Sequence, residues 1–174
     1  RWGALYADTY QSQEALNLYT EALALEPENS YAKLAAAEIL LASGEKQAVE
    51  QIEQLADDGS VPIGVRVKAT IVLANIALKR DEIERAGGLL DSAENFSSDS
   101  SDDTLLLGVY AMRAGKAVRN RQNPEEWIER ALQINPAYGD AYAIPAYFYM
   151  ITFRYDETGE YYQRAVDVQD DHWE

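Results

Sequence analysis

The chain has 174 residues, with 15 Lys and Arg against 30 Asp and Glu, so its formal charge is −15. A chain of this length and composition can bury about 70% of its unfolded surface in a core. The absence of Cys excludes disulfides and thiolate zinc sites, and the single His, His172, excludes a site that needs two imidazoles. Because the charge excess repels phosphate backbones and anionic headgroups, neither nucleic acid nor a membrane is expected as a partner.

Small residues recur through the chain in two registers whose members lie 33 to 38 residues apart. Small residues on two antiparallel helices let the backbones approach closely, and large apolar residues one turn away fill the flanking space. Each repeat is therefore predicted to be a helical hairpin. The first register is Gly3, Ala37, Ala74, Gly108 and Ala146, and the second is Ala22, Leu55, Ala93, Ala131 and Ala165.

Hydrophobic periodicity, together with the residues that begin and end helices, predicts a series of helices in chain order. First helices fill the gaps between second helices, which are expected near 12–25, 45–57, 82–95, 125–135 and 156–169. Pro145 falls where the fifth first helix should be under way, so we expect a kink there. Helix stops are expected at Pro27 and Pro136, and caps at Asn29-Ser30, at Asp102-Asp103 and at Asn123 before Pro124.

The repeats resemble the tetratricopeptide repeat (TPR) family. The first unit carries Trp2-Gly3, Tyr6, Ala15, Tyr19, Ala22 and Pro27, the third carries Leu73-Ala74, Ala86, Leu90 and Ala93, and the fifth carries Ala146, Tyr149, Tyr155, Tyr162 and Ala165. The resemblance implies an all-α fold, a right-handed α-solenoid of about five hairpins. It also implies one domain over 1–174, with repeats near 1–29, 30–63, 64–100, 101–138 and 139–174. We expect the chain to be a fragment of a larger protein, of bacterial origin.

The sequence lacks the common catalytic and nucleotide-binding motifs. It contains no H-E-x-x-H, no P-loop, no G-x-G-x-x-G and no G-x-S-x-G pattern, so an enzyme, a cofactor and a metal are not expected. The carboxylate pairs Glu125-Glu126 and Asp170-Asp171 are interpreted as helix-terminal charges. His172 beside Trp173 is interpreted as an exposed or capping residue, and the acidic stretch Ser97–Asp103 as a connector whose last Asp caps a helix.

Stacked hairpins of this kind create an inner wall lined by the first helices. The TPR resemblance implies a binding groove there, with an apolar or helical ligand; the alternative is that the same residues pack against neighbouring helices or a flanking segment. The carboxylate clamp of some TPR proteins is disfavoured, because Leu34, Glu38 and Val72 stand where its polar residues are required. The implied groove residues are Leu34, Glu38, Leu41, Lys68, Ile71, Asn75, Leu78, Met112, Arg113, Tyr147 and Met150.

The fifth unit is rich in aromatic residues. Helical spacing places Tyr142 and Tyr149 on the inward face, whereas Phe148, Tyr161 and Trp173 are expected to face the next unit. Because terminal repeats normally need a polar cap, we expect the polypeptide to continue in both directions. Self-association through the uncapped ends is also expected.

The function predicted from the sequence is a protein–protein interaction module that binds a peptide, a partner protein or a flanking domain in the concave groove. Two alternatives stay open: a non-catalytic scaffold arm of a larger enzyme, such as a metallopeptidase, and an end-to-end oligomerisation module. Alanine at Leu41, Leu78 and Met150 is expected to abolish ligand binding in the first case. The sequence carries no targeting segment from which to predict a compartment.

Overall fold

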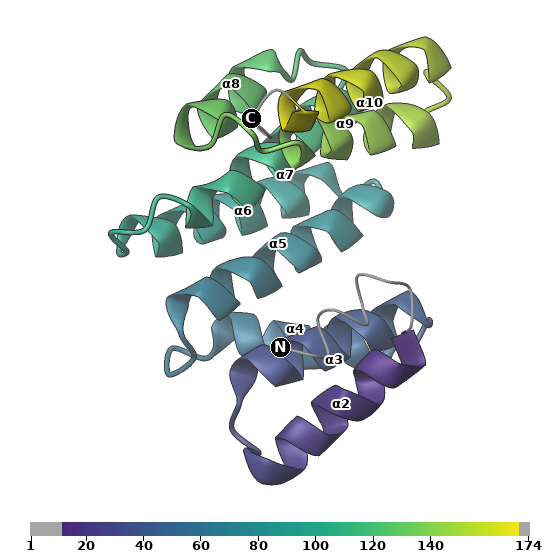
Figure 1. Cartoon of the computed structure of the whole chain (residues 1–174). Coiled ribbons are helices and arrows are strands. Elements are labelled where there is room, and N and C mark those ends of the chain that lie inside the picture. Colours follow the sequence, from purple (N-terminus) through teal and green to yellow (C-terminus); the bar gives the residue numbers. More distant parts are fainter. Residues whose placement is uncertain (1–11, 171–174) are drawn as a thin grey trace. The chain divides into compact units, whose positions relative to one another are not determined.

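The structure is a computed structural model that describes residues 12–170, and every regular element in this range is a helix (Figure 1). The all-α helical-repeat fold class is therefore confirmed. Predictions made at Trp2, Gly3, Tyr6, His172 and Trp173 lie outside the described residues. The helices are α2 (Ser12–Leu25), α3 (Ser30–Ala42), α4 (Gln47–Asp57), α5 (Ile63–Lys79), α6 (Ile83–Ser98), α7 (Leu105–Arg119), α8 (Glu125–Ile134), α9 (Asp140–Ile151) and α10 (Tyr155–Asp170).

Helix starts follow the local signals of the sequence. The five second helices, α2, α4, α6, α8 and α10, begin within two residues of the predicted positions. Asn29 caps α3 as predicted, because its side chain accepts the Ala32 N–H at 3.1 Å. The α7 cap is shifted: Asp102, and not Asp103, accepts the backbone N–H of the N-cap residue Thr104 at 3.0 Å.

A recurrent turn ends each described first helix. Gly44, Asp81, Arg121 and Phe153 all have positive φ, at 86°, 65°, 55° and 62°. The N–H of the following residue bonds a carbonyl five residues earlier in each case, as in Glu45 to Leu40 at 3.0 Å and Arg154 to Tyr149 at 3.0 Å. This is the Schellman arrangement, which satisfies helix-end carbonyls. The sequence does not predict this turn, because only one of the four left-handed positions is occupied by Gly.

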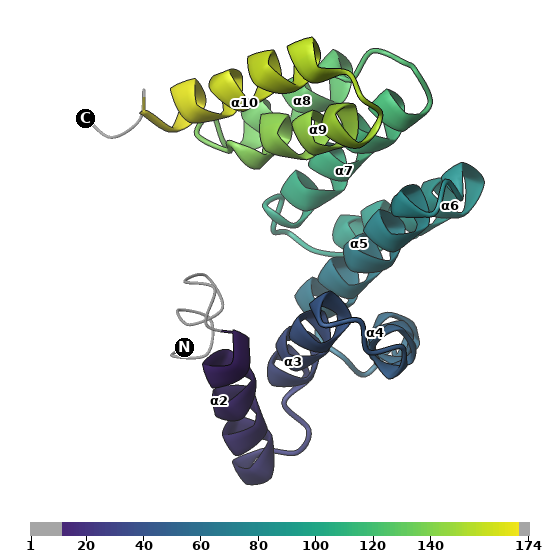
Figure 2. The same cartoon turned by 90° about the vertical axis from the view of Figure 1, so that its right-hand side faces the viewer.

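The chain groups into two compact units, 1–69 and 70–174, whose boundary falls inside α5. In the first unit, α3 packs against both α2 and α4, and Figure 2 shows α3 between them. In the second unit, α7 packs against α6, α8 and α9, and α10 packs against α9. The single domain over 1–174 and its five repeat ranges stay predictions.

Small residues allow the close helix packing that the repeat pattern predicts. Ala37, Ala74 and Ala146 are fully buried. In the second unit, a Cβ added to Gly115 of α7 would lie 2.6 Å from a ring carbon of Phe148 in α9. The two first helices therefore approach each other so closely that only a hydrogen fits at this position.

Two predictions for the aromatic fifth unit are wrong. Phe148 is fully buried against Gly115, and Tyr161 is only 6% exposed, so both belong to the core and do not face outward. The exposed apolar stripe of α10 consists instead of Tyr155, Tyr162 and Val166, which are spaced by seven and four residues and share one helix face.

Pro145 lies inside α9 and is fully buried, and the helix continues through it from Asp140 to Ile151. The kink at this position stays a prediction. Among the helices of residues 12–170, none is long and apolar enough to cross a membrane.

Candidate functional site

Three of the residues predicted to line the groove have almost no exposed surface. Leu34 is 2%, Leu78 is 0% and Met112 is 4% exposed, and all three contribute to the hydrophobic core. This is the packing alternative that the sequence left open. Their helical spacing is the same for a core face and for a groove face, so periodicity alone could not distinguish the two.

Charged members of the predicted groove are paired within the protein. In the first unit, Lys68 Nζ lies 2.8 Å from Glu38 Oε2. In the second unit, Arg113 Nη2 contacts Asp91 at 2.8 Å and Glu94 at 2.5 Å. A partner that recruited either cation would have to compete with these carboxylates.

The other predicted residues are partly accessible. Tyr147 is half-buried, with Lys79 Nζ 5.2 Å from its ring centroid, and Met150 is 38% exposed. Leu41, Ile71 and Asn75 are half-buried. Leu41 belongs to the first unit, whereas Ile71, Asn75, Tyr147 and Met150 belong to the second, and the groove stays a prediction.

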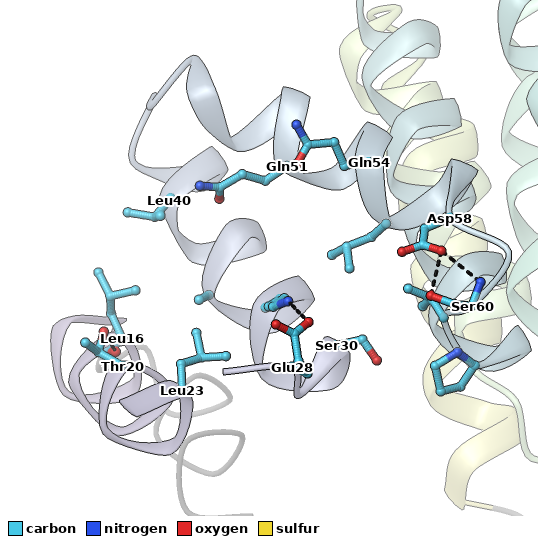
Figure 3. Close-up of a pocket in the computed structure, with 15 residues that line it drawn as sticks. Leu16, Thr20, Leu23, Glu28, Ser30, Leu40, Gln51, Gln54, Asp58 and Ser60 are labelled. Atoms are coloured by element: carbon cyan, nitrogen blue, oxygen red, sulfur yellow. Dashed lines mark hydrogen bonds and ion pairs between the residues drawn. The ribbon is translucent and has the colours of Figure 1, made fainter. Parts of the chain in front are cut away.

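The first unit contains a cleft of about 750 Å³ that is lined by residues of α2, α3 and α4 and of the turn after α4 (Figure 3). One stripe from each helix lines it. Leu16, Thr20 and Leu23 come from α2, and Gln51 and Gln54 come from α4, at the i, i+3, i+4 and i+7 spacings that place residues on one helix face. The remaining lining residues are Glu28, Ser30, Lys33, Ala36, Leu40, Leu55, Asp58, Ser60, Val61 and Pro62.

The lining of the cleft mixes apolar with polar side chains. Leu16, Leu23 and Leu40 supply apolar surface, whereas the amides of Gln51 and Gln54 can each donate and accept hydrogen bonds. Ligand-binding sites likewise combine apolar surface with hydrogen-bonding side chains, although the share of polar residues in this cleft is higher than is usual.

Charged side chains also line the cleft. Lys33 Nζ pairs with Glu28 at 2.9 Å. Asp58 accepts hydrogen bonds from the Ser60 hydroxyl at 2.7 Å and from the Ser60 backbone N–H at 2.8 Å. These two bonds, the hydroxyl first, lower the pKa of Asp58 below its ordinary value of 3.8, so its carboxylate is ionised at neutral pH.

The possible metal ligands among the described residues form no cluster. In residues 12–170 no three His, Cys, Asp or Glu side chains gather where they could hold a metal ion. The carboxylate of Glu125, adjacent to Glu126 in the sequence, is held by Arg164 and Tyr161. The groups that line the cleft supply apolar surface and hydrogen-bonding side chains.

Comparison with solved structures identifies the fold. A thermophilic TPR protein of Thermus thermophilus, TTC0263, superimposes with a TM-score of 0.69 at 20% identity, over 99% of this chain and 90% of that one. The TPR-like repeats of a Podosopora anserina protein give a TM-score of 0.57 at 18% identity, over 97% of this chain and 91% of that one. The chain has the TPR fold. The resemblance found in its sequence is confirmed at this level.

Sequence comparison gives a relationship to part of a much longer protein. No known family model matches the chain. The human protein O-mannosyl-transferase TMTC1 is 25% identical over 173 residues, which are 97% of this chain and 19% of the relative. The chain thus spans about a fifth of the length of that relative.

On this TPR fold, the cleft uses a different face of α3 from the one predicted. The expected groove residues of α3 are Leu34, Glu38 and Leu41, whereas Ser30, Lys33 and Leu40 face the cleft. The stripes Leu16–Leu23 and Gln51–Gln54 are visible as helical spacing in the sequence. The same spacing occurs on a stripe that a neighbouring helix covers and on a stripe that stays open. The cleft could therefore not be predicted from the sequence.

Proposed function

We propose that this chain is a protein-interaction module and that a peptide segment of a partner protein lies in the cleft lined by α2, α3 and α4. The observation that carries the proposal is the cleft itself, about 750 Å³ in volume and lined by both apolar and polar side chains. A volume of this size accommodates several side chains.

The lining chemistry favours a segment with apolar anchors. Leu16, Leu23 and Leu40 would bury aliphatic or aromatic side chains of the partner, and burial contributes roughly 25 cal/mol per Å² of apolar surface. Gln51 and Gln54 would pair with the backbone of the bound segment, because an amide side chain can satisfy both an N–H and a C=O group.

The test begins with peptides selected from a random phage-displayed library against the purified chain. Affinity of a selected peptide is then measured by fluorescence anisotropy for two variants of α4. Gln51→Trp fills the cleft, whereas Gln47→Trp places the same ring on an exposed residue that does not line it. We expect about tenfold or greater weakening for Gln51→Trp only, corresponding to about 1.4 kcal/mol or more.

The concave groove expected from the sequence is the competing location for the ligand. Leu41→Ala and Met150→Ala test it, because both residues retain exposed surface. Leu78→Ala is unsuitable, because this fully buried side chain supports the core and its loss would destabilise the fold. Weakened binding in the two groove variants, with Gln51→Trp unaffected, would place the peptide in the groove and contradict the cleft.

A second candidate is that the chain is a non-catalytic scaffold arm of a larger enzyme. It is supported by the human relative, whose name is that of a protein O-mannosyl-transferase and which this chain matches over 19% of its length. We propose that the chain alone transfers no mannose to protein. Mannosyl transfer by the purified chain, lost when the chain is heat-unfolded, would contradict this proposal.

A further inference from the structure

The second unit contains a cavity of about 630 Å³ that the predicted groove does not include. It is lined by Asp81, Val118, Arg119, Arg121, Thr152 and Arg154, and we call it the arginine cavity. Its residues come from three successive turns that end α5, α7 and α9. Three arginines face this cavity in a chain whose acidic residues outnumber its basic residues by two to one.

The recurrent Schellman turn explains why these side chains converge. Asp81 and Arg121 occupy the same left-handed position of two turns, and Arg154 directly follows the left-handed Phe153 of the third. Because each turn repeats the same backbone geometry, equivalent residues of the second unit project from the same edge of the repeats.

The arginines keep unused hydrogen-bond donors. Arg119 donates through Nη2 to Asp81, and its buried Nε has no partner among the described residues. Arg154 donates through Nε and Nη2 to Glu157 Oε1, at 2.9 and 2.5 Å. The exposed side chain of Arg121 makes no ion pair or hydrogen bond within residues 12–170. Each guanidinium carries five N–H donors, so several stay available at the cavity.

Charge also favours an anion. The three arginines carry three positive charges, and the carboxylates paired with them, Asp81 and Glu157, carry two negative charges. The sum of these five charges is positive. The guanidinium fork matches the planar geometry of a carboxylate.

We propose that the arginine cavity binds a carboxylate-bearing peptide segment of a partner protein. The volume of the cavity is large enough for a peptide segment and exceeds that of a single small ion. A long polyanion such as nucleic acid would be repelled by the −15 charge of the chain. The site lies in a different unit from the cleft and stands independently of it, so binding at either one can fail without the other.

The experiment measures anisotropy of a rhodamine-labelled peptide of alternating Glu and Gly, titrated with the purified chain at low salt. The control peptide has Gln in place of Glu. Arg121→Gln removes the unpaired cation and leaves its left-handed backbone occupied by a long side chain. Arg130→Gln is the matched control, because this exposed arginine of α8 pairs with Glu126 and does not line the cavity.

We expect the Glu peptide to bind about tenfold or more tightly than the Gln peptide, and Arg121→Gln to remove about the same factor. Arg130→Gln should change the affinity by less than about twofold, and added salt should weaken binding. Equal affinity of both peptides, or equal loss in both arginine variants, would overturn the proposal. Two further titrations use inorganic phosphate and phosphatidylserine vesicles in place of the Glu peptide. Tighter binding of either one than of the Glu peptide would also overturn the proposal.

Discussion

Arg164 of α10 donates two hydrogen bonds to Glu125 at the start of α8, with Nη1–Oε1 at 2.6 Å and Nη2–Oε2 at 3.0 Å. Tyr161 donates its hydroxyl to the same carboxylate at 2.7 Å, and the Arg164 guanidinium lies 4.3 Å from the Tyr142 ring centroid. These contacts connect α8, α9 and α10 in the second unit. A bidentate charged pair with an added phenol is stronger than an exposed ion pair of equal length.

Replacement of Glu125 is therefore expected to reduce stability. Glu125→Gln removes the charge of the partner while Arg164 stays partly buried, and we expect a loss of about 1–2 kcal/mol after allowance for solvent screening. The matched control is Glu126→Gln, whose partner Arg130 is exposed, with a loss of about 0.5 kcal/mol or less. Urea unfolding followed by circular dichroism measures both, and equal losses would show that the Arg164 contact adds nothing.

Acid should weaken the same contact. The Arg164 hydrogen bonds lower the pKa of Glu125 below its ordinary value of 4.5, and partial burial opposes them only in part. A carboxyl whose folded pKa is depressed stabilises the fold above its unfolded pKa, and this contribution disappears as the pH falls through the folded value.

We therefore expect the stability difference between wild type and Glu125→Gln to be full near about pH 6 and to shrink towards about pH 3. Unfolding free energies measured at several pH values for both proteins test this expectation. A difference that stays constant across the range would contradict the depressed pKa.

Substitution of Gly115 tests the close approach of α7 and α9. A methyl group would lie 2.6 Å from the buried Phe148 ring, so Gly115→Ala should destabilise the chain by about 1–3 kcal/mol through overpacking. Gly88→Ala in α6 meets nothing within 4 Å and should stabilise by about 0.5–1 kcal/mol through helix propensity. Thermal unfolding gives both values, and shifts of the same sign would refute the packing argument.

The recurrent turn predicts opposite effects at two equivalent positions. Phe153 has a φ of 62° and is 78% exposed, so Phe153→Gly should relieve about 1 kcal/mol of backbone strain. Gly44 has a φ of 86° with open space around it, and Gly44→Ala should cost about 1–2 kcal/mol. If calorimetry finds Phe153→Gly less stable than wild type, the exposed ring contributes more than the strain removes.

Self-association through exposed ends stays a prediction, now supported by different residues. Phe148 and Tyr161 are buried, whereas Tyr162 and Val166 form part of the exposed stripe of α10. Light scattering should show mass that rises with concentration in wild type and less so in Val166→Glu, because a charge on an apolar contact is costly to bury. No rise in wild type would exclude association through α10 at the concentrations used.

The helices and their packing partners could largely be predicted from the sequence, because local signals decide them. The Asn29 cap and the registers around Ala37 and Ala146 depend on neighbouring residues and on a repeated pattern. The turn at Phe153 could not be predicted, since its left-handed backbone is imposed by the packing of helices on each side and not by the residue.

The candidate site could be predicted only in part. On α3, the predicted groove residue Leu34 is buried, whereas Leu40, more than one turn further along the helix, faces the cleft. Arg121 and Arg154 carry no sequence motif that pairs them, and only the three-dimensional repeat of the turns brings them to one cavity. Long-range convergence of this kind is invisible to periodicity.

Photocrosslinking shows whether a partner peptide occupies the cleft lined by α2, α3 and α4. A selected peptide that carries a benzophenone group is irradiated with the chain, and the attached residues are mapped by mass spectrometry. We expect attachment to lining residues of α2, α3 and α4, such as Leu23, Leu40 and Gln54. Attachment concentrated at Tyr147 and Met150 of α9 would contradict it.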